Sequence, residues 1–203
     1  MTKDVLIRKS RRTGLKIGLF GGSFNPAHDG HLHVAQTALK SLNLDEIWWL
    51  VSPQNPLKPE QPSYASRAAT VTALPLSRRM KISMLEIENG TQFTIDMVRK
   101  AQQLYPNSRF VFLMGADNFA QFPRWKNWRE IAAAMPIAII ARPTKSGEPH
   151  FKARLGQAAR MYSGARVSES QSHILASRAA PAWTYITAPL SRLSSSAIRA
   201  SQR

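Results

Sequence analysis

The sequence lacks cysteine altogether and is poor in acidic residues. The absence of cysteine excludes a disulfide framework and any thiolate metal site, and it is typical of a protein of the reducing cytoplasm. The 12 aspartate and glutamate residues form no paired set along the chain. We therefore expect a cytoplasmic protein with no metal site built from its own side chains.

Long hydrophobic runs and the common glycine-rich signatures are also missing. No apolar run approaches the about 20 residues that a membrane span needs, and the basic start MTKDVLIRKSRRTG lacks the apolar core of a secretory signal. Neither the dinucleotide-binding fingerprint nor the Walker A loop occurs, because the glycine spacing and the lysine differ. The sequence thus predicts no membrane partner and no standard phosphate loop.

Basic residues, by contrast, are in large excess. The 28 lysines and arginines give a formal net charge of +16, which attracts anions such as nucleic acid, acidic lipid or phosphorylated small molecules. Part of this charge is local, since several basic side chains crowd the first residues. We interpret residues 1–14 as a solvated basic tail rather than a nucleic-acid-binding arm, and we do not favour a nucleic-acid partner.

Residues 15–203 have the size of a single domain, and 43% of the residues in the whole chain are hydrophobic. Short apolar runs predict buried strands at Leu15–Phe20, Glu46–Val51, Lys81–Leu85, Arg109–Met114 and Pro136–Ala141. Apolar spacing predicts helices after the histidines near residue 30, from about Ser63 to before Pro75, and from a cap at Thr94 onward. Strands that alternate with helices indicate an α/β fold with a doubly wound parallel sheet.

Two details of this pattern are open to test. In the helix that starts at Thr94, we expect Met97, Val98, Ala101 and Leu104 to face inward. From 143 to 182 the pattern weakens, and we expect a mobile region in which SESQSH, residues 168–173, is a loop.

The stretch GGSFNPAHDGHL, Gly21 to Leu32, concentrates the chemistry. Glycines at the end of a strand let a ligand approach the backbone, and the next helix directs its free N–H groups at the same place. His28 and His31 can both face an anion there, and Gly30 leaves room between them. A zinc site would favour histidines four apart with a third ligand, nucleophilic catalysis would need a base for Ser23, and purely structural histidines remain an alternative.

The C-terminal segment offers a second phosphate-type helix start. Ser194, Ser195 and Ser196 open a short predicted helix, and Arg199 lies one turn further along. Serine hydroxyls, free backbone N–H groups and a forked guanidinium together suit phosphate oxygens. The alternative is an ordinary serine cap on a terminal helix.

These motifs carry a resemblance to a known family. GGSFNPAHDGHL resembles the first motif of the HxGH nucleotidyltransferases, and LSSSAIR resembles their second motif, although Leu193 and Ser196 replace the commoner isoleucine and threonine. Between them, NPLK, FTIDMV, GADNFAQFPRWKNW and ARPT follow the order seen in bacterial nicotinate-nucleotide adenylyltransferases. The resemblance covers about residues 16 to 199, while 143–182 matches little.

The resemblance implies a Rossmann-like domain that transfers AMP from ATP to nicotinate mononucleotide, with Mg²⁺ carried by ATP. It implies catalytic roles for His28, His31, Lys58 and Arg199. The implied ATP-binding residues are Gly21, Gly22, Ser23, Phe24, His28, Gly30, His31, Ser194, Ser195, Ser196 and Arg199. For Lys58, a solvated loop lysine is the rival interpretation.

For the acceptor, the resemblance implies contacts from Asn55, Thr94, Asp117, Trp125, Lys126 and Arg142. Some of these residues have ordinary structural alternatives. Asp117 could cap a helix, Trp125 could belong to the core, and Arg142 could pair with a surface acid.

Three other functions remain open from the sequence. The chain could be a related adenylyltransferase that acts on nicotinamide mononucleotide or on pantetheine phosphate, and the region of Trp125 should discriminate between ring substituents. A basic RNA-binding module is the alternative from a different class, although no RNP, KH or zinc signature occurs. The oligomeric state is left open.

Overall fold

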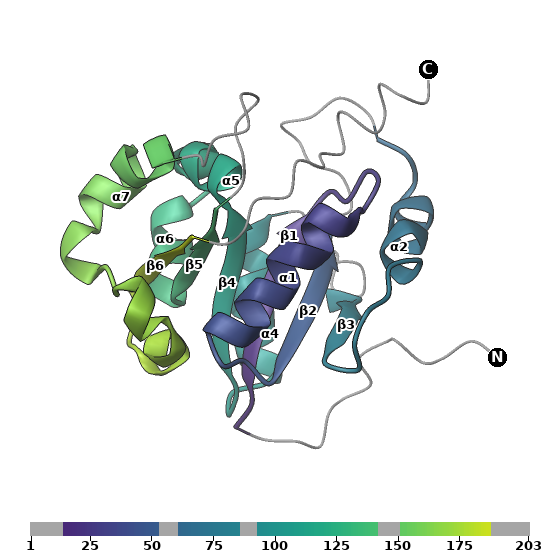
Figure 1. Ribbon diagram of the computed structural model, residues 1–203, viewed down its shortest axis with the longest axis horizontal. Coiled ribbons are helices and arrows are strands. Elements are labelled where there is room, and N and C mark those ends of the chain that lie inside the picture. Colours follow the sequence, from purple (N-terminus) through teal and green to yellow (C-terminus); the bar gives the residue numbers. More distant parts are fainter. Residues whose placement is uncertain (1–13, 53–60, 86–92, 142–150, 188–203) are drawn as a thin grey trace.

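The computed structural model describes residues 14–52, 61–85, 93–141 and 151–187. Within these ranges, a six-stranded parallel sheet forms the centre of the molecule (Figure 1). Its strands are β1 Lys16–Gly22, β2 Glu46–Val51, β3 Met80–Ser83, β4 Arg109–Gly115, β5 Ile137–Ile140 and β6 Trp183–Ile186. The spatial order is β3-β2-β1-β4-β5-β6, so the direction of winding changes between β1 and β4.

The strands are apolar because helices cover both faces of the sheet. All six residues of β2 are buried, and its side chains alternate between two cores: Trp48 joins one and Trp49 the other. β1 alternates in the same way, with Leu19 in the first core and Phe20 in the second. Continuous apolar runs of this kind are typical of parallel strands that are buried on both faces.

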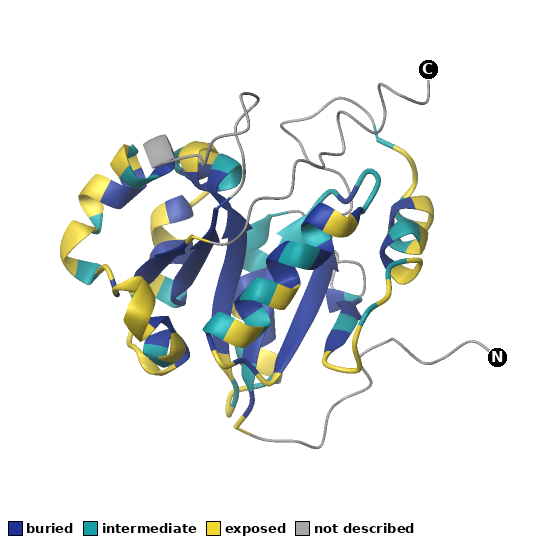
Figure 2. Cartoon of the chain, viewed as in Figure 1, coloured by how far each residue is buried: buried dark blue, intermediate teal, exposed yellow. Residues whose placement is uncertain are grey.

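Helices from separate parts of the chain form the two outer layers. One face is covered by α1 Asp29–Ser41, α2 Tyr64–Thr72 and the 3₁₀ segment η4 Glu169–Ser177. The other face is covered by α4 Thr94–Leu104, α5 Ala116–Gln121, η1 Phe122–Arg124, α6 Trp128–Ala134, η2 Phe151–Leu155 and α7 Gln157–Met161, with η3 Ser163–Ala165 following. Figure 2 shows the buried strands between helices whose outer faces are exposed. No helix in the described ranges is long and apolar enough to cross a membrane.

The expected α/β fold with a doubly wound parallel sheet is confirmed, and so are all five predicted strands, within one or two residues at their ends. Two details of α4 need correction. Phe93, not Thr94, is the N-cap residue, and Thr94 is the first residue of the helix. Leu104 is 41% exposed instead of facing inward. Leu104 is exposed because the next residue, Tyr105, covers the core at this point: its ring packs on Trp48 with the centroids 4.9 Å apart.

The expectation of a loop at 168–173 is wrong, because residues 169–173 belong to η4 and Ser168 is its N-cap residue. The Ser172 hydroxyl donates to the carbonyl of Ser41 at 2.9 Å, and Oε1 of Glu169 accepts from the Thr187 N–H at 2.6 Å. Leu175 is fully buried against the sheet. The polar side chains that indicated a loop instead form hydrogen bonds that hold the 3₁₀ turns against α1 and the end of β6.

Candidate active site

β1 and β4 are neighbours at the centre of the sheet, and the chain leaves them toward opposite faces. A loop leads from β1 to α1 on one face, whereas β4 continues directly into α5 on the other. Open parallel sheets bind ligands beyond the carboxyl ends of such a strand pair. Gly21 and Gly22 end β1 at this edge, and Gly115 ends β4. The predicted position of the two glycines is therefore confirmed.

His28 closes the loop and begins α1 as its N-cap residue. Its Nδ1 accepts a hydrogen bond from the Gly30 N–H at 3.1 Å, and its carbonyl accepts from the His31 N–H at 2.8 Å. Because Nδ1 is an acceptor, the neutral ring carries its proton on Nε2. The imidazole centroids of His28 and His31 lie 3.9 Å apart. The structure thus brings both histidines together at a helix N-terminus, where the helix dipole favours an anion.

Buried aromatic rings fix the orientation of His31. The ring of Phe24 meets His31 edge to face, with centroids 5.1 Å apart. Phe24 contacts Phe20 at 5.4 Å and Trp49 at 5.1 Å in turn, and only 2% of its surface is exposed. Edge-to-face contacts are a preferred aromatic geometry. The imidazole therefore rests on a rigid apolar base.

Thr94, Trp125 and Lys126 form a second group near the same edge. The ammonium of Lys126 lies 3.9 Å above the ring of Phe93, in a cation–π contact that joins this loop to the start of α4 and hence to Thr94. Trp125 is half-buried, and its ring is nearly perpendicular to that of Phe122 at 5.5 Å. The fold thus brings the loop of Trp125 and Lys126 to the start of α4, although the two segments are distant in the sequence.

The ring of Phe112 on β4 lies near both Gly21 and Trp125. A Cβ atom at Gly21 would lie 3.3 Å from its ring, and the centroid of Trp125 lies 6.0 Å from its centroid at 90°. Asp117 lies in the first turn of α5, directly after β4, and is half-buried. Gly21 at the end of β1 and Trp125 therefore both lie against this one buried ring.

The other predicted site residues lie outside the described residues. They are Asn55, Lys58, Arg142, Ser194, Ser195, Ser196 and Arg199. Their roles stay predictions.

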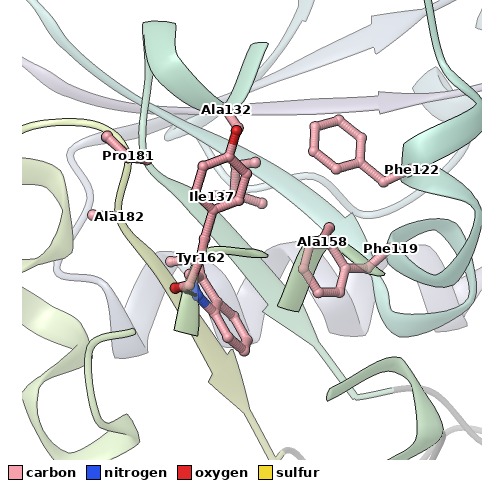
Figure 3. Close-up of a pocket in the computed structure, with 9 residues that line it drawn as sticks. Phe119, Phe122, Ala132, Ile137, Ala158, Tyr162, Pro181 and Ala182 are labelled. Carbon is pink, nitrogen blue, oxygen red and sulfur yellow. Dashed lines mark hydrogen bonds between the residues drawn. The ribbon is translucent and has the colours of Figure 1, made fainter. Parts of the chain in front are cut away.

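A small cavity and an open groove, both lined by described residues, lie away from the histidines. A cavity of about 10 Å³ is enclosed by apolar side chains that include Phe119, Phe122 and Trp183 (Figure 3), and its volume is that of one water molecule at most. An open groove of about 360 Å³ runs past Arg109 and Pro136, at the amino ends of β4 and β5. Neither position is the carboxyl edge at which the predicted residues gather.

Comparison with known proteins defines the class first. The family described as Cytidylyltransferase-like matches residues 19–201, which is most of the chain and includes both phosphate-type motifs. The chain belongs to this family.

Curated relatives narrow the class further. The probable nicotinate-nucleotide adenylyltransferase of Caulobacter sp. (strain K31) is 47% identical over 190 residues, which cover 93% of this chain and 98% of the relative. The protein of the same name from Ruegeria sp. (strain TM1040) is 44% identical over 186 residues, with 91% and 96% covered. Within its family, the chain therefore belongs with the nicotinate-nucleotide adenylyltransferases, as the resemblance in its motifs implied.

Solved structures support the fold. The Plasmodium falciparum nicotinic acid mononucleotide adenylyltransferase complexed with NaAD superposes with a TM-score of 0.64 at 20% identity, over 92% of this chain and 83% of that one. A putative nicotinate-nucleotide adenylyltransferase from Vibrio parahaemolyticus has a TM-score of 0.52 at 26% identity, with 62% and 76% covered. The first of these likenesses extends the shared architecture over nearly the whole chain.

Sequence reasoning missed three residues that shape this edge: Arg67, Phe93 and Phe112. Phe93 directly precedes the predicted site residue Thr94, and Phe112 lies inside a predicted strand. Neither residue therefore has a sequence feature that indicates a role at the site. Arg67 had a weak one. It lies one helical turn before Val71, on the face of α2 that is buried. A charged residue at an apolar position of a helical pattern marks a place where the core contains a polar contact.

Proposed function

We propose that the chain transfers the adenylyl group of ATP to nicotinate mononucleotide, forming nicotinate adenine dinucleotide and pyrophosphate in NAD biosynthesis. One observation carries the proposal: two imidazoles 3.9 Å apart begin α1 beside the glycines that end β1, in a chain 44% identical to a relative of that name. The lack of cysteine fits a reducing compartment, and we propose the cytoplasm as its place of work.

The chemistry needs no nucleophile from the protein. A phosphate oxygen of nicotinate mononucleotide attacks the α-phosphorus of ATP in line, a new P–O bond forms, and the bond to the bridging oxygen breaks as pyrophosphate leaves. Catalysis then consists of holding both nucleotides in line and of stabilising the negative charge that develops on the phosphates. Donors fixed at a helix start suit that task.

We assign this stabilisation chiefly to His28 and His31. Since Nδ1 accepts from the Gly30 N–H, His28 would use its Nε2 proton to donate to a phosphate oxygen. His31 is held against Phe24 and directs a second imidazole to the same region. Gly21 and Gly22 let the triphosphate approach the backbone closely.

The remaining predicted residues complete the proposal. Ser194, Ser195, Ser196 and Arg199 would grip the β- and γ-phosphates, with Lys58 beside them, and Ser23, Phe24 and Gly30 would line the ATP site. Asn55, Thr94, Asp117, Trp125, Lys126 and Arg142 would bind nicotinate mononucleotide, with the ring of Trp125 on the pyridine.

A divalent metal is expected to accompany the triphosphate, and we propose Mg²⁺. In the part of the chain that the structure describes, no three His, Asp or Glu side chains come together as a ligand set. Among the predicted site residues that the structure describes at the carboxyl edge, Asp117 is the one carboxylate, and the others offer imidazoles, hydroxyls, an ammonium and aromatic rings, which do not fit a carboxylate cage. An ion that keeps its waters and is held mainly by substrate phosphates matches this donor set.

The decisive experiment measures pyrophosphate release from ATP with three acceptors: nicotinate mononucleotide, nicotinamide mononucleotide and pantetheine phosphate. We expect kcat/KM for the acid form to exceed that for the amide by at least about tenfold, or 1.4 kcal/mol. A pocket lined by N–H donors suits a carboxylate, whereas an amide NH₂ would leave donors unpaired. Equal use of acid and amide, or a preference for pantetheine phosphate, would refute the assignment of the acceptor. Salt-sensitive RNA binding without pyrophosphate release would instead indicate the RNA-binding alternative.

A further inference from the structure

Arg67 on α2 is a buried arginine with an uncommon set of partners. Only 1% of its surface is exposed. Its Nη1 donates to the carbonyl of Ser23 at 2.7 Å, and its Nε donates to the carbonyl of Pro62 at 2.9 Å. A buried guanidinium is costly unless directed hydrogen bonds offset its desolvation. The bond to Ser23 reaches the loop that joins β1 to α1, 44 residues earlier in the chain, while the bond to Pro62 is local.

Neighbouring side chains fasten the same loop at further points. The hydroxyl of Thr70, one turn after Arg67, accepts from the Ala27 N–H at 2.9 Å. The amide of Gln61 lies 3.4 Å from the hydroxyl of Ser23. Figure 1 shows the loop between the start of α1 and α2. The loop is therefore tied to α2 at both of its ends, at Ser23 and at Ala27.

The part of the loop between these ties has a backbone shape that needs support. Phe24 has φ of 46°, in the left-handed region that bulky residues rarely adopt. In a trans peptide the C=O and the N–H point in opposite directions. Since Arg67 draws the carbonyl of Ser23 toward α2, the N–H of Phe24 points away from α2. The ring of Phe24 meanwhile lies on His31.

We propose that Arg67 is a positioning residue for adenylyl transfer, a role that rests on the proposed function. By holding the Ser23 carbonyl, it directs the Phe24 N–H toward the nucleotide phosphates and keeps the Phe24 ring against His31. Arg67 itself does not touch the substrate. Its contribution is to preorganise one backbone donor and one imidazole before the phosphates arrive.

Arginine is required here for its shape as well as its charge. Its planar fork presents N–H groups in fixed directions, so that Nη1 and Nε reach two carbonyls at once. Lysine would keep the positive charge but could not hold both carbonyls in the same geometry. Arg67→Lys therefore separates the effect of geometry from the effect of charge.

The test uses the full chain in the pyrophosphate-release assay with ATP and nicotinate mononucleotide. Arg67→Lys is compared with Arg160→Lys, a control on an exposed helical position of α7. Folding is checked for both by thermal melting, and rates are measured well below the melting temperature. We expect Arg67→Lys to lower kcat between about tenfold and a hundredfold, less than the loss of about a hundred- to a thousandfold when a donor is deleted. KM for the acceptor should stay within about twofold, and the control should match the wild type.

A second readout separates positioning from a merely structural role. The Rp and Sp forms of ATP with sulfur at the α-phosphate differ only in which oxygen is replaced, so a correctly placed donor discriminates between them. We expect Arg67→Lys to change this preference by at least about threefold, since the Phe24 N–H is no longer fixed. Thr70→Val, which removes the tie to Ala27, should move the preference in the same direction and serves if Arg67→Lys does not fold.

Two results would overturn the proposal: a folded Arg67→Lys with kcat within about twofold of the wild type, or a lowered kcat with an unchanged Rp/Sp preference. The second result would assign the loss to packing. Failure of the proposed function is a separate outcome, because a wild-type protein that uses another acceptor still allows the same comparison of variants with that acceptor.

Discussion

Replacing Gly22 by alanine should press a methyl group into the ring of Phe24. A Cβ atom at this position would lie 2.9 Å from Cζ, 3.0 Å from Cε1 and 3.2 Å from Cε2 of that ring. The ring has little room to retreat, because Phe20 lies at 5.4 Å, Trp49 at 5.1 Å and His31 at 5.1 Å between centroids. The new contact is therefore relieved mainly by displacing the base on which His31 rests.

The expected loss follows from the cost of overpacking. Extra methylene-sized volume in a packed core typically destabilises by about 1–3 kcal/mol. For a chain of 203 residues, at about 2–4 °C per kcal/mol, Gly22→Ala should lower Tm by about 2–12 °C. Turnover should fall by about tenfold or more at temperatures where the variant is folded, since small misplacements of catalytic groups are costly. Differential scanning calorimetry and the pyrophosphate assay measure the two effects.

A glycine in open space supplies the matched control. A Cβ atom at Gly164 would meet nothing within 4 Å, so Gly164→Ala should leave Tm and kcat close to the wild type. The double variant Gly22→Ala with Phe24→Leu removes the obstructing ring edge, and it should lose less stability than the sum of the single variants by about 1 kcal/mol. Wild-type Tm and turnover in Gly22→Ala, or strict additivity in the double variant, would refute the reasoning.

Three further predictions concern single side chains. His31→Ala should keep the fold by circular dichroism and lower kcat by on the order of a hundred- to a thousandfold, and near-normal turnover would remove it from the catalytic assignment. Trp125→Ala should raise KM for nicotinate mononucleotide more than KM for ATP, because the ring is assigned to the pyridine; an unchanged acceptor KM would mean that the pocket lies elsewhere. Burial raises the pKa of Tyr185 above 10.0, Glu169 adds to the rise and Arg154 opposes it. The unfolded chain therefore loses this proton first as pH rises, so the free energy of unfolding should fall from about pH 9 to about pH 11, and less steeply in Tyr185→Phe by urea titration at both values.

Much of the candidate site could be predicted because its signals are local. Glycines at the end of an apolar run, followed by histidines before a helical pattern, place Gly21, His28 and His31 at the carboxyl edge by strand and helix geometry alone. The use of the His28 ring as an N-cap could not be predicted, since serine, threonine, aspartate and asparagine are the usual capping residues. The cation–π contact of Lys126 with Phe93 was equally hidden, because 33 positions of chain separate the two residues.

The sequence by itself determined the parallel α/β architecture, the strands and the cluster of phosphate-type motifs. Apolar runs, the helical period of 3.6 residues, glycines and caps are properties of short segments, and the order of residues specifies short segments directly. The sequence did not predict the turns of η4. Its serines are typical of a loop, and the hydrogen bond from Ser172 to the carbonyl of Ser41 forms only in the folded structure.

Only the tertiary structure decided which side chains fix the site. Phe24 has a left-handed backbone with φ of 46°, and Arg67 is buried against Ser23, the residue that precedes Phe24. Neither feature follows from the residues adjacent in sequence. The guanidinium that holds Ser23 comes from 44 residues away, so its hydrogen bond exists only once α2 has packed against the sheet. A buried polar group must form hydrogen bonds wherever the fold places it. The local sequence pattern does not specify which distant residue will provide the partner.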